Sequence, residues 1–93
     1  MSIEVKFYSL FRLNLKSSGI EYNIDRTISL EELIDKLDED FEGYFSEKLL
    51  DTGKIRTGSI ILLNGKNVLH LDKLNTKIND GDIVTLFPPS AGG

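Results

Sequence analysis

The chain has 93 residues, no cysteine and a formal net charge of −4. This length allows one domain with one hydrophobic core, and the absence of cysteine excludes disulfides, thiolate catalysis and cysteine-ligated zinc or iron–sulfur centres. Lys and Arg occur singly and no apolar run is long enough for a bilayer span, so we expect no nucleic-acid partner and no membrane segment. The N-terminus alternates apolar and charged residues instead of forming a signal peptide, which predicts a soluble, cytoplasmic protein.

Two strands are predicted near the N-terminus. In residues 3–8 and again in residues 20–24, apolar and polar side chains alternate, and this period of two places one face of each strand in the core. Residues 17–19 have the composition of a turn. The two strands should therefore form an opening hairpin, with a long and partly apolar loop around residues 10–13.

A helix follows and is the most clearly signalled element. Ser29 and Glu32 form the capping-box pattern at its start. Spacings of three and four residues then place one apolar stripe on the helix, formed by Leu30, Leu33, Ile34 and Leu37. Apolar residues continue at intervals of four and predict a second short helix after Gly43, ended by Gly53.

The helical region is also acidic. Such a run is usually the solvated face of a helix, and the alternative is a surface that steers the domain toward basic partners. Both interpretations remain open. The acidic residues are Glu31, Glu32, Asp35, Asp38, Glu39, Asp40 and Glu42.

The C-terminal half predicts three more strands. Residues 59–63 form a short apolar strand that ends at Asn64-Gly65, a strong hairpin signal. A brief return strand should contain Val68, Leu69 and Leu71. Residues 79–82 form another turn, and residues 83–87 form the last strand, because the two following prolines cannot donate to a β-ladder.

These elements predict an α+β domain over residues 1–87 and a flexible tail over residues 88–93. The helix stripe should cover one face of a mixed sheet of four to five strands. Strand alternation then directs Tyr8, Leu62 and Phe87 to the opposite face, where they would form a binding patch. Alternatively, the second short helix or the loop at residues 10–13 covers them.

No residue of the folded body is expected to be catalytic, and no bound cofactor or metal is expected. The glycines of residues 53–59 have the spacing of a phosphate-binding loop but lack its lysine. The acidic run from Asp38 imitates a calcium loop, yet its twelfth position is Leu49 instead of glutamate. His70 is the only histidine, which excludes a histidine pair.

The chemistry is therefore expected at the C-terminal Gly92-Gly93. Glycine has no Cβ, so these residues can thread a narrow channel in a partner. Pro88 and Pro89 would keep the start of the tail extended. The carboxylate of Gly93 would need activation by a separate enzyme that uses ATP to form an acyl adenylate, after which a sulfur donor would displace AMP and leave a thiocarboxylate. A frayed end without function is the alternative.

Three segments, residues 63–65, 79–84 and 87–93, together resemble the MoaD family. The family's Phe-Pro-Pro-x-x-Gly-Gly ending is present as residues 87–93. MoaD proteins are the small, sulfur-carrying subunits of molybdopterin synthase, and the resemblance implies the ubiquitin-like β-grasp fold. It also implies adenylation and thiocarboxylation of Gly93 by an adenylyltransferase that resembles the ubiquitin-activating enzyme, followed by insertion of the tail into the large synthase subunit. Tyr8 and Phe87 match the family's apolar interface positions. Near a third such position this sequence has the polar Asn67, and Leu62 would take its place in the interface.

The resemblance leaves the recipient of the activated carboxylate open. Related carriers serve thiamine synthesis, tRNA thiolation or cysteine synthesis. Conjugation to amines as a ubiquitin-like protein modifier is the main alternative, because it uses the same activated Gly93. An interaction module with an inert tail is the third possibility.

Overall fold

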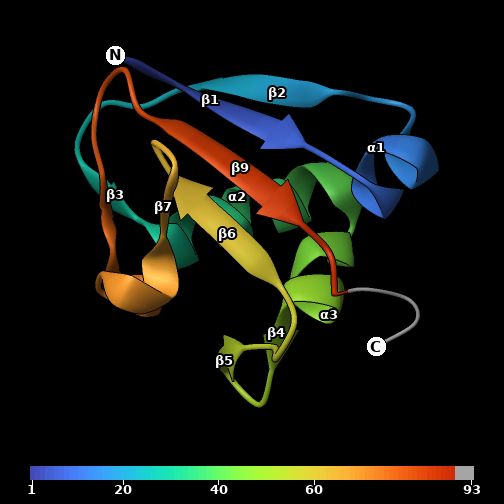
Figure 1. Ribbon diagram of the computed structural model, residues 1–93. Coiled ribbons are helices and arrows are strands. Elements are labelled where there is room, and N and C mark those ends of the chain that lie inside the picture. Colours follow the sequence, from blue (N-terminus) through green and yellow to red (C-terminus); the bar gives the residue numbers. More distant parts are fainter. Residues whose placement is uncertain (90–93) are drawn as a thin grey trace.

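A five-stranded mixed sheet forms the centre of the protein in the computed structural model, which describes residues 1–89 (Figure 1). The strand order is β2-β1-β9-β6-β7, in which β1 and β9 are parallel and the other neighbours are antiparallel. The strands are β1 (Ser2–Phe7), β2 (Gly19–Asn23), β6 (Ile60–Leu63), β7 (Lys66–Asn67) and β9 (Ile83–Phe87).

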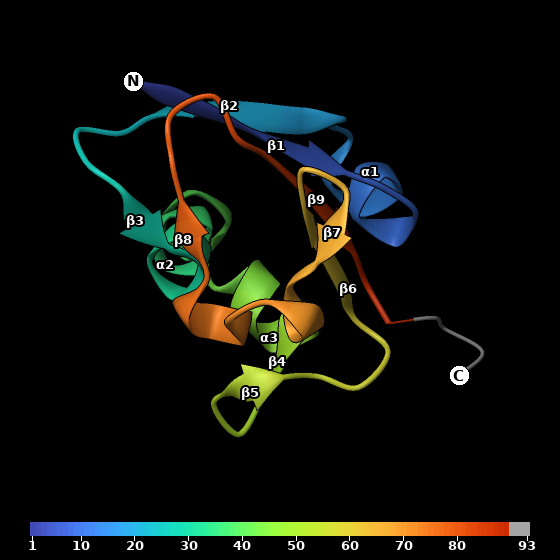
Figure 2. The ribbon, with the colours of Figure 1, turned by 60° about the vertical axis from the view of Figure 1, so that its left-hand side comes forward.

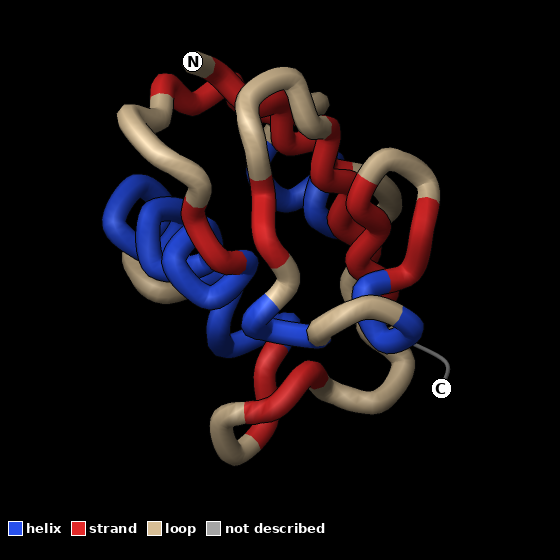
Figure 3. Tube along the Cα trace, turned by 90° about the vertical axis from the view of Figure 1, so that its left-hand side faces the viewer, coloured by secondary structure: helices blue, strands red, loops and turns tan. Residues whose placement is uncertain are grey.

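The main helix and the helix that follows it lie on one side of this sheet (Figure 3). The main helix is α2 (Leu30–Phe41), followed by α3 (Tyr44–Leu49), and none of the described helices is long and apolar enough to cross a bilayer. The predicted α+β architecture with one main helix on one face of the sheet is confirmed. The remaining elements are α1 (Leu10–Leu15), the 3-10 turns η1 (Val68–His70) and η2 (Lys73–Asn75), and the two-residue strands β3 (Ile28–Ser29), β4 (Leu50–Asp51), β5 (Lys54–Ile55) and β8 (Lys77–Ile78).

Helix α2 begins as its sequence predicts. The Ser29 hydroxyl accepts a hydrogen bond from the Glu32 backbone N–H at 3.1 Å, and the Glu32 carboxylate accepts one from the Ser29 N–H. The Arg26 guanidinium lies 2.6 Å from the same carboxylate. Arg26, together with the Ser29 N–H, holds the pKa of Glu32 down at about 2, so the cap stays ionised near neutral pH.

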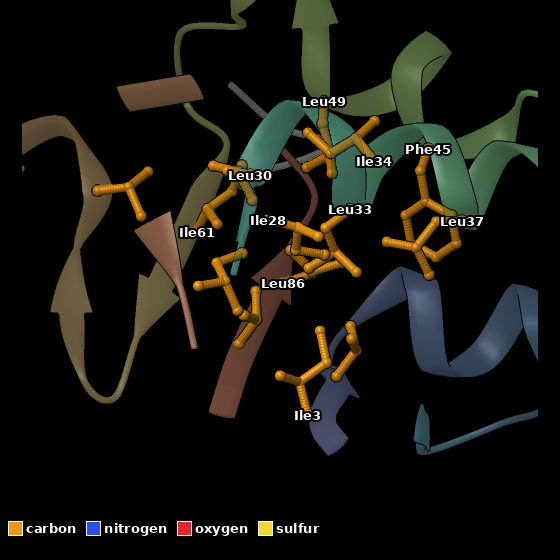
Figure 4. Close-up of a cluster of buried hydrophobic side chains, with 14 of the residues drawn as sticks. Ile3, Ile28, Leu30, Leu33, Ile34, Leu37, Phe45, Leu49, Ile61 and Leu86 are labelled. Atoms are coloured by element: carbon orange, nitrogen blue, oxygen red, sulfur yellow. The ribbon is translucent and has the colours of Figure 1, made fainter. Parts of the chain in front are cut away.

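The predicted apolar stripe of α2 forms the helix side of the hydrophobic core. All four of its residues, Leu30 to Leu37 at the predicted spacing, are buried. They face the inward side chains of the sheet, such as Ile3, Ile61 and Leu86, with Phe45 and Leu49 of α3 beside them (Figure 4). Burial of this apolar area stabilises the two-layer packing by roughly 25 cal/mol per Å².

Three local predictions are wrong. The second short helix ends at Leu49, before the predicted stop at Gly53, which lies in the β4–β5 turn. The expected loop at residues 10–13 is the helix α1, which turns Phe11 into the core. The return strand after Asn64-Gly65 is shorter and earlier than expected, since only Lys66 and Asn67 pair with β6. The Asn67 side chain then accepts a hydrogen bond from the Leu69 N–H at 2.9 Å, which caps η1 and ends the strand.

The two predicted turns meet at one end of the sheet. Asn64 and Gly65 both have positive φ, as a tight two-residue hairpin requires. The Asn64 side chain accepts from the Ile83 N–H at 2.8 Å and donates to the Asp82 carboxylate at 2.9 Å. Asp82 in turn accepts from the Asn79 N–H at 2.7 Å. These hydrogen bonds fix the start of β9, the strand that leads to the C-terminus.

Candidate functional site: the outward sheet face and the C-terminal stem

The uncovered face of the sheet presents a stacked aromatic pair. The Tyr8 N–H donates to the Leu86 carbonyl at 3.2 Å, which extends the β1–β9 ladder by one residue and brings Tyr8 beside Phe87. The two rings stack with centroids 5.2 Å apart and planes 19° apart. The neighbours of these residues in sequence, Phe7 and Leu86, point the other way and are buried. Strand alternation therefore produces the outward pair.

Strand β6 adds aliphatic side chains to the same face. The antiparallel register places Ile60 opposite Phe87 and Leu62 opposite Thr85. Ile60 is 41% exposed and Leu62 is half-buried, whereas Ile61 between them is in the core. We call Tyr8, Ile60, Leu62 and Phe87 the outward patch. Ile60 was not among the predicted residues of this face, although extending the alternation of β6 by one residue reaches it.

The patch lies outside the core cluster and borders helix α1. Tyr8, Leu62 and Phe87 keep part of their surface exposed and lie outside the buried cluster. Helix α1 contributes one neighbour, because the Arg12 guanidinium lies 5.8 Å from the centre of the Tyr8 ring. Lys6 pairs with Thr85 in the next row. The face is thus apolar at its centre with cations beside it, and its role in partner binding stays a prediction.

The C-terminal stem, Pro88-Pro89, packs against the body. Both prolines are half-buried. Gly58 has φ +93°, and a Cβ at that position would lie 3.5 Å from the Cβ of Pro89, so the two chain segments are in close contact. The stem also lines an open groove of about 460 Å³ with α1 and α3, whose contributions include Leu10, Tyr44 and Lys48. Packing of the stem sets the direction in which the chain leaves the sheet.

Gly92 and Gly93 lie outside the described residues, so their predicted chemistry rests on the sequence. Within residues 1–89, no three His, Asp or Glu side chains come together as a metal site. In the same range, the one large pKa change besides that of Glu32 belongs to Tyr22, whose pKa is raised by burial and by its hydrogen bond to the Asp40 carboxylate. That bond, 2.6 Å long, ties β2 to α2 and is structural.

Comparison with known proteins decides the family. Residues 15–93 match the ThiS family. The chain belongs to this family. The ThiS-family chain is 31% identical to small archaeal modifier protein 3 of Haloferax volcanii over 93 residues, which is 100% of both sequences.

Solved structures show the same fold. A solution structure of a Haloferax volcanii protein is 31% identical, with a TM-score of 0.83 over 100% of this chain and 87% of that one. The crystal structure of small archaeal modifier protein 1 from the same organism has a TM-score of 0.79, with 24% identity and 100% coverage of both chains. The fold is therefore the ubiquitin-like β-grasp. Membership of the ThiS/MoaD superfamily of sulfur carriers and small modifiers is confirmed, whereas the narrower MoaD assignment stays a prediction.

Proposed function

We propose that this ThiS-family chain is a ubiquitin-like protein modifier, joined through the carboxylate of Gly93 to lysine amines of other proteins. The main support is its similarity to small archaeal modifier protein 3, which extends over all 93 residues of both sequences. The family match likewise reaches Gly93, the second of the two terminal glycines. The relative is named as a modifier protein. This name favours the alternative given above, conjugation to amines of other proteins, over sulfur transfer to a pterin.

The chemistry needs only the carboxylate from this chain. An oxygen of Gly93 attacks the α-phosphorus of ATP in an activating enzyme, pyrophosphate leaves, and an acyl adenylate forms. A lysine amine then attacks the carbonyl carbon, AMP leaves, and loss of a proton gives the isopeptide bond. Two terminal glycines suit this route because residues without Cβ pass through a narrow channel. The partner enzyme supplies the ATP site and the catalytic groups.

The body would hold the activating enzyme while the tail reacts. In this proposal the outward patch contacts the partner, because large, partly exposed aromatic side chains are the residues that most often dominate interfaces. Arg12 and Lys6 would add charge at its edge. Pro88 and Pro89 would aim the tail, since the packing of Pro89 against Gly58 fixes the point of exit.

Sulfur transfer is the second candidate, and the Phe87-Pro88-Pro89 stem favours it. This stem, with its stacked Tyr8, matches the MoaD pattern described above. A hydrosulfide ion would attack the carbonyl carbon of the same adenylate, so that AMP leaves, a proton is lost and a C-terminal thiocarboxylate remains. The large subunit of molybdopterin synthase would then receive the tail, and the pterin precursor would receive the sulfur; tRNA thiolation and thiamine synthesis are other routes from the same intermediate.

Mass spectrometry separates the two candidates. A tagged chain would be purified from its native cells under denaturing conditions and digested with trypsin. Lys77 is the last Lys or Arg, so a conjugated lysine would retain residues 78–93; a Ser90→Lys variant shortens this remnant to Ala-Gly-Gly. We expect substrate lysines with these remnants, and none from a chain lacking Gly93. Intact protein in which one oxygen is replaced by sulfur, without any lysine remnant, would favour the sulfur carrier.

A further inference from the structure

A second groove is lined by residues other than those of the stem groove. It has a volume of about 640 Å³ and lies between the β4–β5 hairpin and the turns η1 and η2. Figures 2 and 3 show this hairpin beside the short helical turns that precede β8. We call it the leucine–lysine groove, after its principal lining residues Lys54, Ile55, Leu69, Leu71, Lys73 and Leu74.

The groove exposes apolar surface that the fold does not use. Ile55 and Leu74 form its base and pack partly against the core. Leu69 and Leu71 are 46% and 42% exposed, because η1 turns only Val68 inward. Single exposed leucines are common on protein surfaces, but two beside an open hollow form a contiguous apolar site.

The charged residues that line the groove are mainly positive, whereas the whole chain is negative. Lys54 and Lys73 line it, and Lys77 lines a smaller hollow that shares Leu71 and Asp72 with it. Asp72 is the one acidic lining residue. Within residues 1–89 none of these lysines forms an ion pair. In a chain of net charge −4, this local excess of exposed ammonium groups would attract an anionic partner.

From this combination we infer that the leucine–lysine groove docks an acidic peptide segment of another protein, one that places leucine or isoleucine side chains between carboxylates. A second copy of this chain fits less well: the apolar side chains of its acidic helix α2 are buried or, for Phe41, packed against the core, and are not free to enter the groove. Nucleic acid also fits less well, since no aromatic side chain lines the groove for base stacking.

This site is independent of the tail chemistry. The groove shares no lining residue with the stem groove or with the outward patch. A partner docked there would leave Tyr8, Phe87 and the stem free. A partner could therefore bind at the groove both before and after the C-terminus has reacted. If the peptide-binding inference is wrong, the proposed function is not affected.

Titration of the full-length, ¹⁵N-labelled protein tests the inference. The probes are a panel of short synthetic peptides in which leucine or isoleucine cores of varied spacing are flanked by glutamates. We expect amide shifts at residues 53–55 and 69–75, with none at Tyr8 or Phe87. Binding should weaken as salt increases, because the charges involved are exposed. Peptides with serine in place of the apolar core, or lysine in place of glutamate, should not bind.

Variants then assign the contacts. Leu69→Ser with Leu71→Ser, and separately Lys54→Glu with Lys73→Glu, should each weaken peptide binding about tenfold or more. Leu13→Ser and Lys16→Glu are matched controls on exposed positions outside the groove and should bind normally. Melting temperatures identify any variant that fails to fold. If the lysine double variant fails, Lys73→Glu alone replaces it. The inference is overturned if no panel member shifts these amides, if an oligonucleotide shifts them instead, or if they shift only with protein concentration through self-association.

Discussion

At the scale of single residues, Phe87 links the fold to the proposed function. It ends β9, stacks on Tyr8 and is followed at once by the stem. We predict that Phe87→Ala weakens binding to the activating enzyme by about 2 kcal/mol, which is roughly thirtyfold. Stability should fall by only about 1 kcal/mol, since the main interaction lost within the chain is one aromatic stack.

Calorimetric titration and thermal unfolding measure the two effects separately. Leu13→Ala, at a residue 71% exposed on α1, is the control and should change neither. A sharp fall in melting temperature with unchanged affinity would mean that Phe87 serves the core, and the assignment of the outward patch to partner binding would be wrong.

Gly19 is the residue whose backbone the sheet depends on most. It opens β2 opposite Lys6 with φ +152°, and a Cβ there would lie 2.2 Å from the Val5 carbonyl oxygen. Backbone cannot move aside cheaply, so we predict that Gly19→Ala destabilises the fold by about 3 kcal/mol.

The matched comparison is Gly43→Ala. Gly43 also has positive φ, at +80°, but no atom lies within 4 Å of the added Cβ. Gly43→Ala should lower the free energy of unfolding only by the left-handed backbone penalty of about 1 kcal/mol. Urea unfolding measures both variants, and equal losses would show that the contact with Val5 has no energetic effect.

At the scale of elements, the sequence predicts structure where a local signal and burial agree. Helix α2 has both, in its capping box and its buried stripe. Helix α1 lacks a capping signal, because Ser9 makes no side-chain cap, and it lacks a buried stripe, because Phe11 is its one buried residue. The apolar residues of η1 imitate a strand, although Val68 alone is buried. Strands of two residues, such as β3 and β8, are too short for any period to appear.

The link between the β6–β7 hairpin turn and the turn that precedes β9 gives a prediction at this scale. Asn64 joins the β6–β7 turn to the start of β9 through Ile83 and Asp82. Asn64→Gly retains the positive φ but loses these hydrogen bonds, and we predict a loss of about 1 kcal/mol. Asn64→Ala loses both features and should cost about 2 kcal/mol. Chemical denaturation orders the two variants, and an unchanged stability of Asn64→Gly would show that the link adds nothing.

At the scale of the whole molecule, the leucine–lysine groove shares no lining residue with the stem groove or with the outward patch. Strand alternation predicts Tyr8, Leu62 and Phe87 on one face because that signal is local. The groove could not be predicted, since its walls come from residues 53–55 and 69–75, which only tertiary packing brings together. For the same reason the contact of Pro89 with Gly58 does not follow from the proline pair alone.

The central claim is that the carboxylate of Gly93 is the reacting group, and ATP–pyrophosphate exchange with the cognate activating enzyme tests it most directly. The full chain should support exchange. A chain without Gly93, and one with a single residue added after it, should not, while their melting temperatures stay within the small range typical of surface changes. Undiminished exchange by either altered chain would contradict the claim.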